Sequence, residues 1–367
     1  MQELNIKAFG QYITRLINKD NLSRQEAYEA FSIVLNNETT EIQQGAFLAA
    51  LSAKGETKDE IAGCWQAIYD NDTIKVNPKV TGPIVENCGT GMDSFKTFNI
   101  STCASLVAVA GGINIARHGA RALTSSCGTV DIAEALGVDV EGGVEIAVNS
   151  LEKMGLALFN GMSPKVHPNA LGRILSQMSF GSTLNIAASL ASPVLPDVGV
   201  RGVYAKEMII PVIEVMQTIG YKRALVFNGQ IDGLTTSMDE ASVAGITYIA
   251  ELCEDGIIRE YSIRPEDAGI SLENANDLEP LGCLTKESKR VVDLLKSGKK
   301  DACFYAVALN AGMIFYAAGK AESIKEGTQL AVDILESGKA YQVLENWTQA
   351  QNQKPEEGLQ KLQSITA

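Results

Sequence analysis

The sequence has few of the residues on which metal and nucleophilic chemistry usually depends. Its 367 residues include only two histidines, His118 and His167, which argues against a histidine-rich zinc site. Its seven cysteines are an odd number, and none forms a Cys-x-x-Cys pair. We expect reduced, buried thiols that pack as small apolar side chains; the alternative is a reactive thiol at Cys88 or Cys127.

Basic residues are outnumbered, and long apolar runs are missing. Lysine and arginine total 31 against 44 aspartates and glutamates, which gives a net charge of −13 and a pI of about 4.8. Such a surface repels nucleic acid and anionic membranes, so any recognition of phosphate must be local. No signal peptide or membrane span is visible, and we expect a cytoplasmic protein without nucleic-acid or membrane partners.

What the chain does contain is a cluster of loops rich in glycine and hydroxyl groups within residues 84–131. The loops are residues 89–93, 99–102, 117–121 and 124–129. Glycines in the first loop allow the backbone to approach a ligand closely, and the second loop precedes an apolar helical run, where free N–H groups favour anions. Four such loops favour a site for a multiply phosphorylated small molecule.

The chain divides into a helical part and an α/β part. Residues 1–73 show four helical patterns, two of them starting with the capping-box signals of Ser23 and Thr57. Beyond the Pro- and Gly-containing segment 74–83, apolar runs alternate with helical patterns, which predicts an α/β domain with a mainly parallel central sheet. We expect a helical domain over 1–73, completed by a segment around 169–195, and an α/β domain over 80–165 and 198–367.

Within the α/β domain, the ligand-binding loops should lie at the carboxyl ends of the strands. An Asp-Gly turn predicts a hairpin of segments 246–252 and 257–263. Helices are expected at 286–297, 301–317, 324–338 and 339–352, and the polar tail after them is expected to be frayed.

One acidic pair, Asp239-Glu240, lies near an expected loop end. Adjacent carboxylates suit Mg²⁺, which prefers oxygen ligands and often bridges carboxylates to substrate phosphates. From composition alone, a solvated pair on a surface loop is the favoured interpretation.

The order of motifs changes this balance. GTGxD, TFNIST, a basic residue before HG, SSxxGxxD, a His-Pro and a DGL…DE stretch together resemble the anthranilate phosphoribosyltransferase family, over nearly the whole chain. The resemblance implies a fold like that of the nucleoside phosphorylases and phosphoribosyltransferases. It implies a pentosyltransferase that uses Mg²⁺ and moves 5-phosphoribose from phosphoribosyl diphosphate to the amine of anthranilate, in tryptophan biosynthesis, or to a related small aromatic acceptor. It also implies a homodimer formed through the helical domain.

The resemblance assigns residues to the donor and the metal. Those that would bind phosphoribosyl diphosphate are Gly89, Thr90, Gly91, Asp93, Thr97, Asn99, Ile100, Ser101, Thr102, Arg117, Gly119, Thr124, Ser125 and Thr129. Those that would hold Mg²⁺ are Ser101, Asp239 and Glu240, the last two only if residues 235–238 are counted as an insertion. Catalysis would be electrostatic, so no covalent nucleophile is assigned.

The departures from the family pattern lie on the acceptor side. Ala120 replaces an amide, Gln177 and Met178 replace an Arg-Arg pair, and Met92 replaces a glycine. Arg173, four residues before Gln177, could substitute for the missing arginines. The remaining residues expected on this side are His118 and His167, each of which could instead be structural.

Two other classes of function stay open. One is a non-catalytic paralogue that binds a nucleotide or nucleic acid. The other is an enzyme like the nucleoside phosphorylases, against which the acidic pair argues because a monophosphate pocket does not need it.

Overall fold

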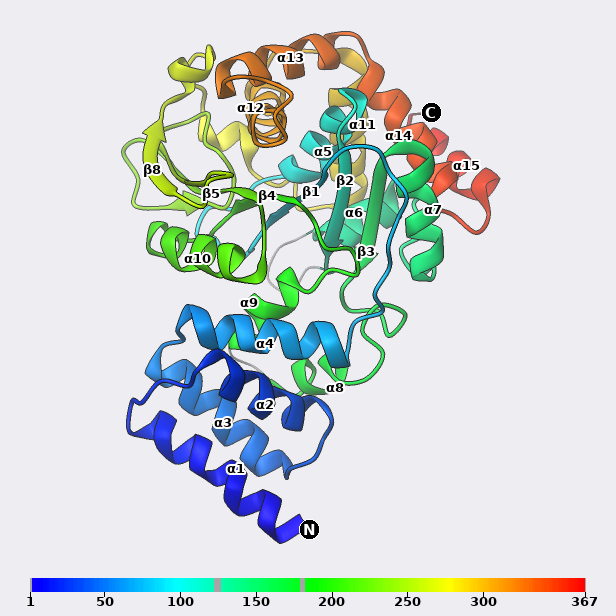
Figure 1. The fold of residues 1–367 in the computed structure, drawn as a ribbon. Helices are drawn as coiled ribbons and strands as arrows, with labels where there is room; N and C mark the ends of the chain where they lie inside the picture. The colour runs from blue at the N-terminus through cyan, green and yellow to red at the C-terminus, as the bar shows by residue number, and fades with distance from the viewer. Residues whose placement is uncertain (1, 122–126, 179–181, 367) are drawn as a thin grey trace. The chain divides into compact units, whose positions relative to one another are not determined.

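The computed structural model describes residues 2–121, 127–178 and 182–366. Thr124 and Ser125 of the expected phosphate pocket therefore lie outside the described residues. The chain forms two compact units (Figure 1). The helical unit comprises Met1–Val76, Gly161–Pro193 and Glu214–Gly220; the sheet unit comprises Asn77–Asn160, Val194–Ile213 and Tyr221–Ala367.

The helical unit is built from amphipathic helices around an aromatic core. Phe47 packs against both Phe9 and Phe31, with ring centroids 5.3 and 5.2 Å away. Capping boxes begin two of the helices at Ser23 and Thr57, as the sequence predicts. The helices are α1 (Gln2–Ile17), α2 (Arg24–Leu35), α3 (Glu41–Lys54), α4 (Lys58–Asn71), α8 (Leu171–Leu175), α9 (Thr183–Leu190) and the last residues of α10 (Ile209–Ile219).

The sheet unit contains one mixed sheet in the strand order β3-β2-β1-β4-β5-β7-β8, with β6 paired to β5. The first five strands in that order are parallel, whereas the pairings of β5 with β6, β5 with β7 and β7 with β8 are antiparallel. The predicted fold class and the predicted hairpin are thus confirmed. The strands are β1 (Ile84–Gly89), β2 (Asn114–Gly119), β3 (Leu156–Asn160), β4 (Val198–Gly202), β5 (Arg223–Gln230), β6 (Ser237–Met238), β7 (Thr247–Leu252) and β8 (Ile258–Ile263).

Helices of the sheet unit bury its apolar side chains. α5 packs against α12, and both are almost entirely buried (Figure 1). The α-helices are α5 (Ile100–Ala110), α6 (Thr129–Ala135), α7 (Val144–Met154), α11 (Leu284–Ser297), α12 (Ala302–Ala317), α13 (Ile324–Glu336), α14 (Lys339–Ala350) and α15 (Pro355–Thr366). Short 3₁₀ turns are η1 (Lys206–Met208), η2 (Pro265–Ala268) and η3 (Ala275–Leu278).

The expectation of a frayed tail is wrong, because the tail forms α15. Its apolar residues recur at helical spacing, and Leu362 is fully buried. Gly358 also approaches Gly137 so closely that neither position has room for a β-carbon. Helical periodicity was therefore present in a segment whose polar composition concealed it.

The strand order creates a position suited to ligand binding. The chain runs outwards from β1 through β2 to β3, then returns to the other side of β1 with β4. In parallel sheets, such a reversal opens a crevice at the carboxyl ends of the two central strands. Here those ends are Gly89 and Gly202, which are partners in the sheet register.

Within residues 2–121, 127–178 and 182–366, every helix is too short or too polar to cross a bilayer.

Candidate functional site

The acidic pair Asp239-Glu240 lies directly over the carboxyl ends of three strands. A β-carbon added to Gly89 or Gly202 would come within 3.0 Å of Asp239, and one added to Gly229 within 3.0 Å of the Glu240 carbonyl oxygen. These glycines end β1 and β4 and precede the last residue of β5. The missing side chains let the acidic segment sit against the sheet, at the topological reversal.

Hydrogen bonds join the acidic pair to two of the sequence-predicted loops. The Gly91 N–H donates to Asp239 Oδ2 over 2.7 Å. The Ser101 N–H donates to Glu240 Oε1 over 3.1 Å, and the Ser101 hydroxyl donates to the same oxygen. The first loop, the first turn of α5 and the acidic pair therefore meet at one place.

Burial and a neighbouring carboxylate disfavour the ionised form of each acidic side chain. Burial raises the pKa of Asp239, and the charge of Asp93 raises it further. Burial likewise raises the pKa of Glu240, with the charge of Asp239 as the second cause. A cation between such groups would favour the ionised forms.

The donor set fits Mg²⁺. Hard oxygen ligands are present, and both bonds from Ser101 use Oε1 of Glu240, which leaves Oε2 for a metal ion. In the part of the chain that the structure describes, no three His, Cys, Asp or Glu side chains are grouped to hold a metal by themselves. Mg²⁺ does not require such a group, because it usually keeps waters and binds through one or two carboxylates and substrate phosphates.

The remaining residues of the first two loops are partly engaged with the protein. Lys96 Nζ lies 2.7 Å from Asp93 Oδ1, whose side chain is buried. The Thr90 hydroxyl accepts from the Tyr204 N–H over 3.1 Å. Asn99 begins α5 without capping it through its side chain, which donates instead to the Cys127 carbonyl over 3.3 Å. The Ile100 side chain is fully buried, and Thr97 is half-buried.

Arg117 lies beneath the loops and is 2% exposed. Its Nε donates to the Asn87 carbonyl over 3.1 Å and its Nη1 to Thr102 Oγ1 over 2.5 Å, while Nη2 lies 3.5 Å from Thr129 Oγ1. The guanidinium thus links β1 to the first turns of α5 and α6. Gly119 follows on the same strand and leaves the space that the Thr129 side chain fills.

The residues expected on the acceptor side are divided between the two units. His118 and Ala120 belong to the sheet unit, where His118 is buried on β2. The others belong to the helical unit and are His167, Arg173, Gln177 and Met178.

Two of those helical-unit side chains have structural partners. Arg173 donates to Gln44 Oε1 over 3.2 Å and to the Val34 carbonyl over 3.0 Å. His167 Nδ1 lies 2.7 Å from the Asp72 carbonyl, and burial lowers the pKa of His167. Gln177 and Met178 follow the end of α8, with Gln177 exposed.

The cysteines near the loops are not activated. Burial raises the pKa of Cys88 to about 11 and that of Cys127 to about 12. Both are therefore thiols near neutral pH, which argues against the reactive-thiol alternative.

Several residues that shape the site were missed by the sequence reasoning. Asn228 Nδ2 donates to the Met238 carbonyl over 3.2 Å, and Asn310 bonds both backbone groups of Ala241. Their signal was a buried amide inside an otherwise apolar segment, as in ACFYAVALNAGMIFYA. Gly202 and Gly229 gave no signal, because only the folded chain brings the acidic segment against them.

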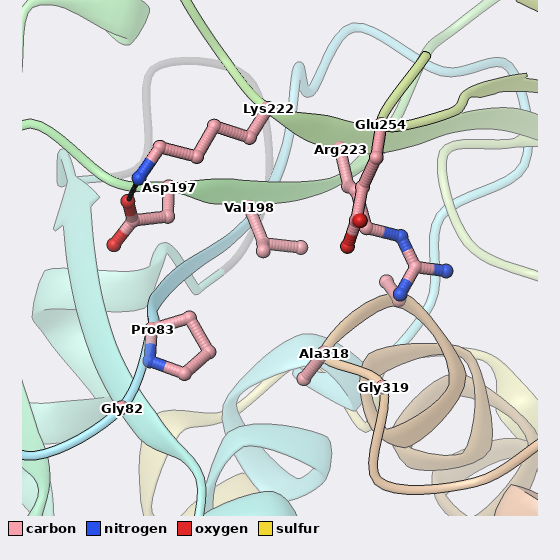
Figure 2. Close-up of a pocket in the computed structure, with 10 residues that line it drawn as sticks. Gly82, Pro83, Asp197, Val198, Lys222, Arg223, Glu254, Ala318 and Gly319 are labelled. Carbon is pink, nitrogen blue, oxygen red and sulfur yellow. Dashed lines mark hydrogen bonds and ion pairs between the residues drawn. The ribbon is translucent and has the colours of Figure 1, made fainter.

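A separate pocket of about 360 Å³ lies at the opposite end of the sheet, where β1, β4 and β5 begin (Figure 2). Lys222 and Asp197 at its edge form an ion pair of 2.6 Å, and Pro83, Val198 and Ala318 supply an apolar wall. Since ligands of parallel sheets bind at the carboxyl ends, this pocket is not the candidate site.

Comparison with protein families defines the class. The glycosyl transferase family, a/b domain, matches residues 81–341, and the helical bundle domain of the glycosyl transferase family matches residues 10–71. The protein is therefore a glycosyltransferase.

Individual relatives narrow the class to one family. The anthranilate phosphoribosyltransferase of Methanothermobacter marburgensis is 35% identical over 337 residues, covering 89% of this chain and 94% of the relative. That of Persephonella marina is 34% identical, covering 91% and 96%. The crystal structure of the Thermus thermophilus enzyme matches with a TM-score of 0.82 and 32% identity, over 92% of this chain and 98% of that chain. The chain belongs to the anthranilate phosphoribosyltransferase family.

A more distant neighbour shares the fold. The anthranilate phosphoribosyltransferase of Saccharomyces cerevisiae, solved in complex with phosphoribosyl diphosphate (PRPP) and Mg, has a TM-score of 0.81 at 20% identity. It covers 94% of this chain and 98% of its own.

Proposed function

We propose that this protein transfers 5-phosphoribose from PRPP to the amine of anthranilate, or of a closely related small aromatic acceptor, with Mg²⁺. In the first case it serves tryptophan biosynthesis. One observation carries the proposal: the acidic pair, with Glu240 buried and Asp239 half-buried, meets a glycine-rich loop and a helix start at the carboxyl ends of β1 and β4. That combination suits a metal-bound diphosphate.

The donor is proposed to bind along the loops of the sheet unit. Backbone N–H groups of residues 89–91 and of the first turn of α5 would contact phosphate oxygens. Arg117 supports this, because no ion pair with a carboxylate is found for its buried guanidinium among the described residues. A buried cation of this kind is stabilised when an anion binds nearby. Thr129, at the start of α6, is proposed to contact the donor phosphates as well, together with Thr124 and Ser125.

The metal is proposed to bind Ser101, Asp239 and Glu240. Because the Ser101 hydroxyl donates its proton to Glu240, its oxygen lone pairs remain available to a cation. When bound, Mg²⁺ would neutralise charge on the diphosphate leaving group. The protein's own part is to hold the ribose and diphosphate in place and to exclude water, so no covalent nucleophile is needed.

The acceptor residues implied by the family resemblance remain part of the proposal, and they are Ala120, His118, His167, Arg173, Gln177 and Met178. Because the Arg173 guanidinium donates hydrogen bonds to Gln44 and to the Val34 carbonyl, we do not expect it to bind an acceptor carboxylate as an Arg pair would. Anthranilate should therefore bind weakly. A homodimer through the helical unit and a cytoplasmic location complete the proposal.

The test is an assay of diphosphate release from PRPP with anthranilate and a series of small aromatic amines. Mg²⁺-dependent turnover of at least one acceptor is expected, and E240Q should lower it by about 100-fold or more. Lys354→Gln, an exposed ion-pair residue of the C-terminal region, serves as the control and should retain full activity. Turnover that is unchanged in E240Q would contradict the metal assignment. A wild-type protein that binds PRPP but turns over no acceptor would favour the non-catalytic paralogue.

A further inference from the structure

Asn310, on α12, holds the backbone immediately after the acidic pair. Its Oδ1 accepts from the Ala241 N–H over 2.9 Å, and its Nδ2 donates to the Ala241 carbonyl over 3.1 Å. One amide side chain thus satisfies both backbone groups of the residue next to Glu240. Asn310 itself is 4% exposed.

The acidic segment depends on such contacts for its geometry. Asp239 and Glu240 form a bend after the two-residue strand β6, and Ala241 has no regular secondary structure. Repeating backbone hydrogen bonds therefore do not fix the directions of the two carboxylates. Below the segment, Gly202 and Gly229 touch its backbone closely, and Asn310 restrains the next residue from the helix.

The helix that carries Asn310 is well anchored. A third bond, from Nδ2 to the Ala306 carbonyl over 2.9 Å, restricts the side chain within its own helix. Gly312, two residues further on, packs against Gly327 of α13 without space for a β-carbon. α12 also begins with a side-chain cap from Asp301. Asn310 is consequently a rigid point of attachment.

We propose that Asn310 is a positioning residue for the metal site: it fixes the backbone of residues 239–241 so that the carboxylates of Asp239 and Glu240 face one cation. This rests on the proposed function of the pair as Mg²⁺ ligands. Asn310 touches neither the metal nor a substrate, and it acts through the Ala241 backbone. Residues that orient metal ligands typically contribute about 10- to 100-fold to metal affinity.

The chain offers a matched control for a purely structural amide. Gln351 makes the same pair of bonds with Leu158 on β3: Oε1 accepts from its N–H over 2.9 Å, and Nε2 donates to its carbonyl over 2.7 Å. Gln351 is likewise buried. Loss of either amide leaves two backbone groups without their partner, so N310A and Q351A should both destabilise the protein. Q351A also removes the acceptor of the Trp347 indole N–H, 3.0 Å away, which makes it the more severe control.

The experiment titrates Mn²⁺, as a probe of the site, into full-length protein with diphosphate present and measures free Mn²⁺ by electron paramagnetic resonance. We expect N310A to weaken Mn²⁺ binding by about tenfold or more and Q351A to leave it unchanged. The Mg²⁺ concentration for half-maximal turnover should rise in parallel, and saturating Mg²⁺ should restore much of kcat. If N310A fails to fold, N310S replaces it, because a hydroxyl can still bond the Ala306 carbonyl but is too short for Ala241.

Three outcomes would overturn the inference. Unchanged Mn²⁺ affinity in a folded Asn310 variant would make the residue structural only. An equal loss in Q351A would attribute the effect to general destabilisation. A wild-type protein that binds no Mn²⁺ would overturn the metal assignment as well, which distinguishes failure of the proposed function from failure of the inference.

Discussion

Met92 is the residue at which the local backbone and the side chain are in conflict. It has φ 66°, a left-handed conformation that follows Gly91 in the same region. A β-carbon disfavours this conformation by roughly 1–2 kcal/mol. The Met92 side chain is 61% exposed, so little burial offsets the strain. The family pattern has glycine here, and the loop keeps the conformation that glycine would adopt freely.

We expect Met92→Gly to be more stable than Met92→Ala by up to about 1 kcal/mol. Glycine removes the strain, although its greater freedom in the unfolded chain offsets part of the gain. Alanine keeps the β-carbon and therefore keeps the strain, which makes it the matched control. Urea unfolding of both variants measures the difference. Equal stabilities would show that the loop relaxes around the side chain.

At the scale of elements, the acidic segment packs directly against the ends of β1, β4 and β5. The contact between Gly202 and the Asp239 carbonyl is tight enough that one methyl group cannot be added without displacing the segment.

Gly202→Ala should therefore destabilise the sheet unit by about 2 kcal/mol or more, by overpacking, and it should abolish turnover. Gly45→Ala is the control, because Gly45 is exposed on α3 and has nothing near its missing β-carbon. That change should stabilise the helical unit by about 0.5–1 kcal/mol. Thermal unfolding and the diphosphate-release assay measure both. An active, stable Gly202→Ala protein would contradict the packing described above.

His167 makes the helical unit sensitive to acid. Burial lowers the pKa of His167 from its usual 6.5. Just below pH 6.5 the histidine of the unfolded chain is therefore protonated while that of the folded protein stays neutral. Its contribution to stability is complete above pH 6.5 and is lost as the pH falls from 6.5 towards the lowered pKa. The loss is at most about 1.4 kcal/mol per pH unit.

His167→Asn should flatten this decline, since asparagine can keep the polar contact with the Asp72 carbonyl but does not titrate. The chain has two tryptophans, and in a Trp347→Phe background Trp65 reports on the helical unit alone. Urea unfolding followed by Trp65 fluorescence at several pH values between 7.5 and 5 tests this. The same slope in both proteins would assign the acid sensitivity to other groups.

The sequence predicted elements well where the pattern is local. The hairpin of β7 and β8 followed from Asp255-Gly256, and the helix starts at Ser23 and Thr57 followed from their capping residues. The missed helix α15 shows the limit of composition, because its few apolar residues are placed correctly for burial although most of the segment is polar.

The sequence could not predict contacts between distant segments. Arg117 was expected to contact the donor, and the structure shows its guanidinium bonded to Asn87, Thr102 and Thr129. The packing of Gly202 against Asp239, and of Asn310 against Ala241, joins segments 37 or more residues apart. No local pattern encodes such pairs, since each depends on the strand order of the whole sheet.

At the scale of the whole molecule, charge limits the choice of partner. The net charge of −13 opposes the neutralisation of many phosphates that nucleic-acid binding requires. Under the proposed function, anion recognition would instead be confined to the loops at the strand ends, where backbone N–H groups and buried Arg117 would provide local positive potential.

We accordingly expect no retention of duplex or single-stranded DNA in a gel-shift assay at about 10 µM protein and 150 mM salt. Nonspecific DNA-binding proteins typically show Kd values of roughly 10⁻⁴–10⁻⁶ M. An assay at 50 mM salt serves as the more permissive comparison. Retention that weakens steeply between the two salt concentrations would instead support the nucleic-acid-binding paralogue.

The bonds between Gln351 and Leu158 also determine when the protein can finish folding. They join residues 193 positions apart, one of them on β3 and the other after α14. During synthesis, β3 emerges from the ribosome long before its amide partner does. The helical unit has all its segments by residue 220 and can assemble earlier, whereas the sheet unit must wait until Gln351 has emerged before its outermost parallel strand is secured.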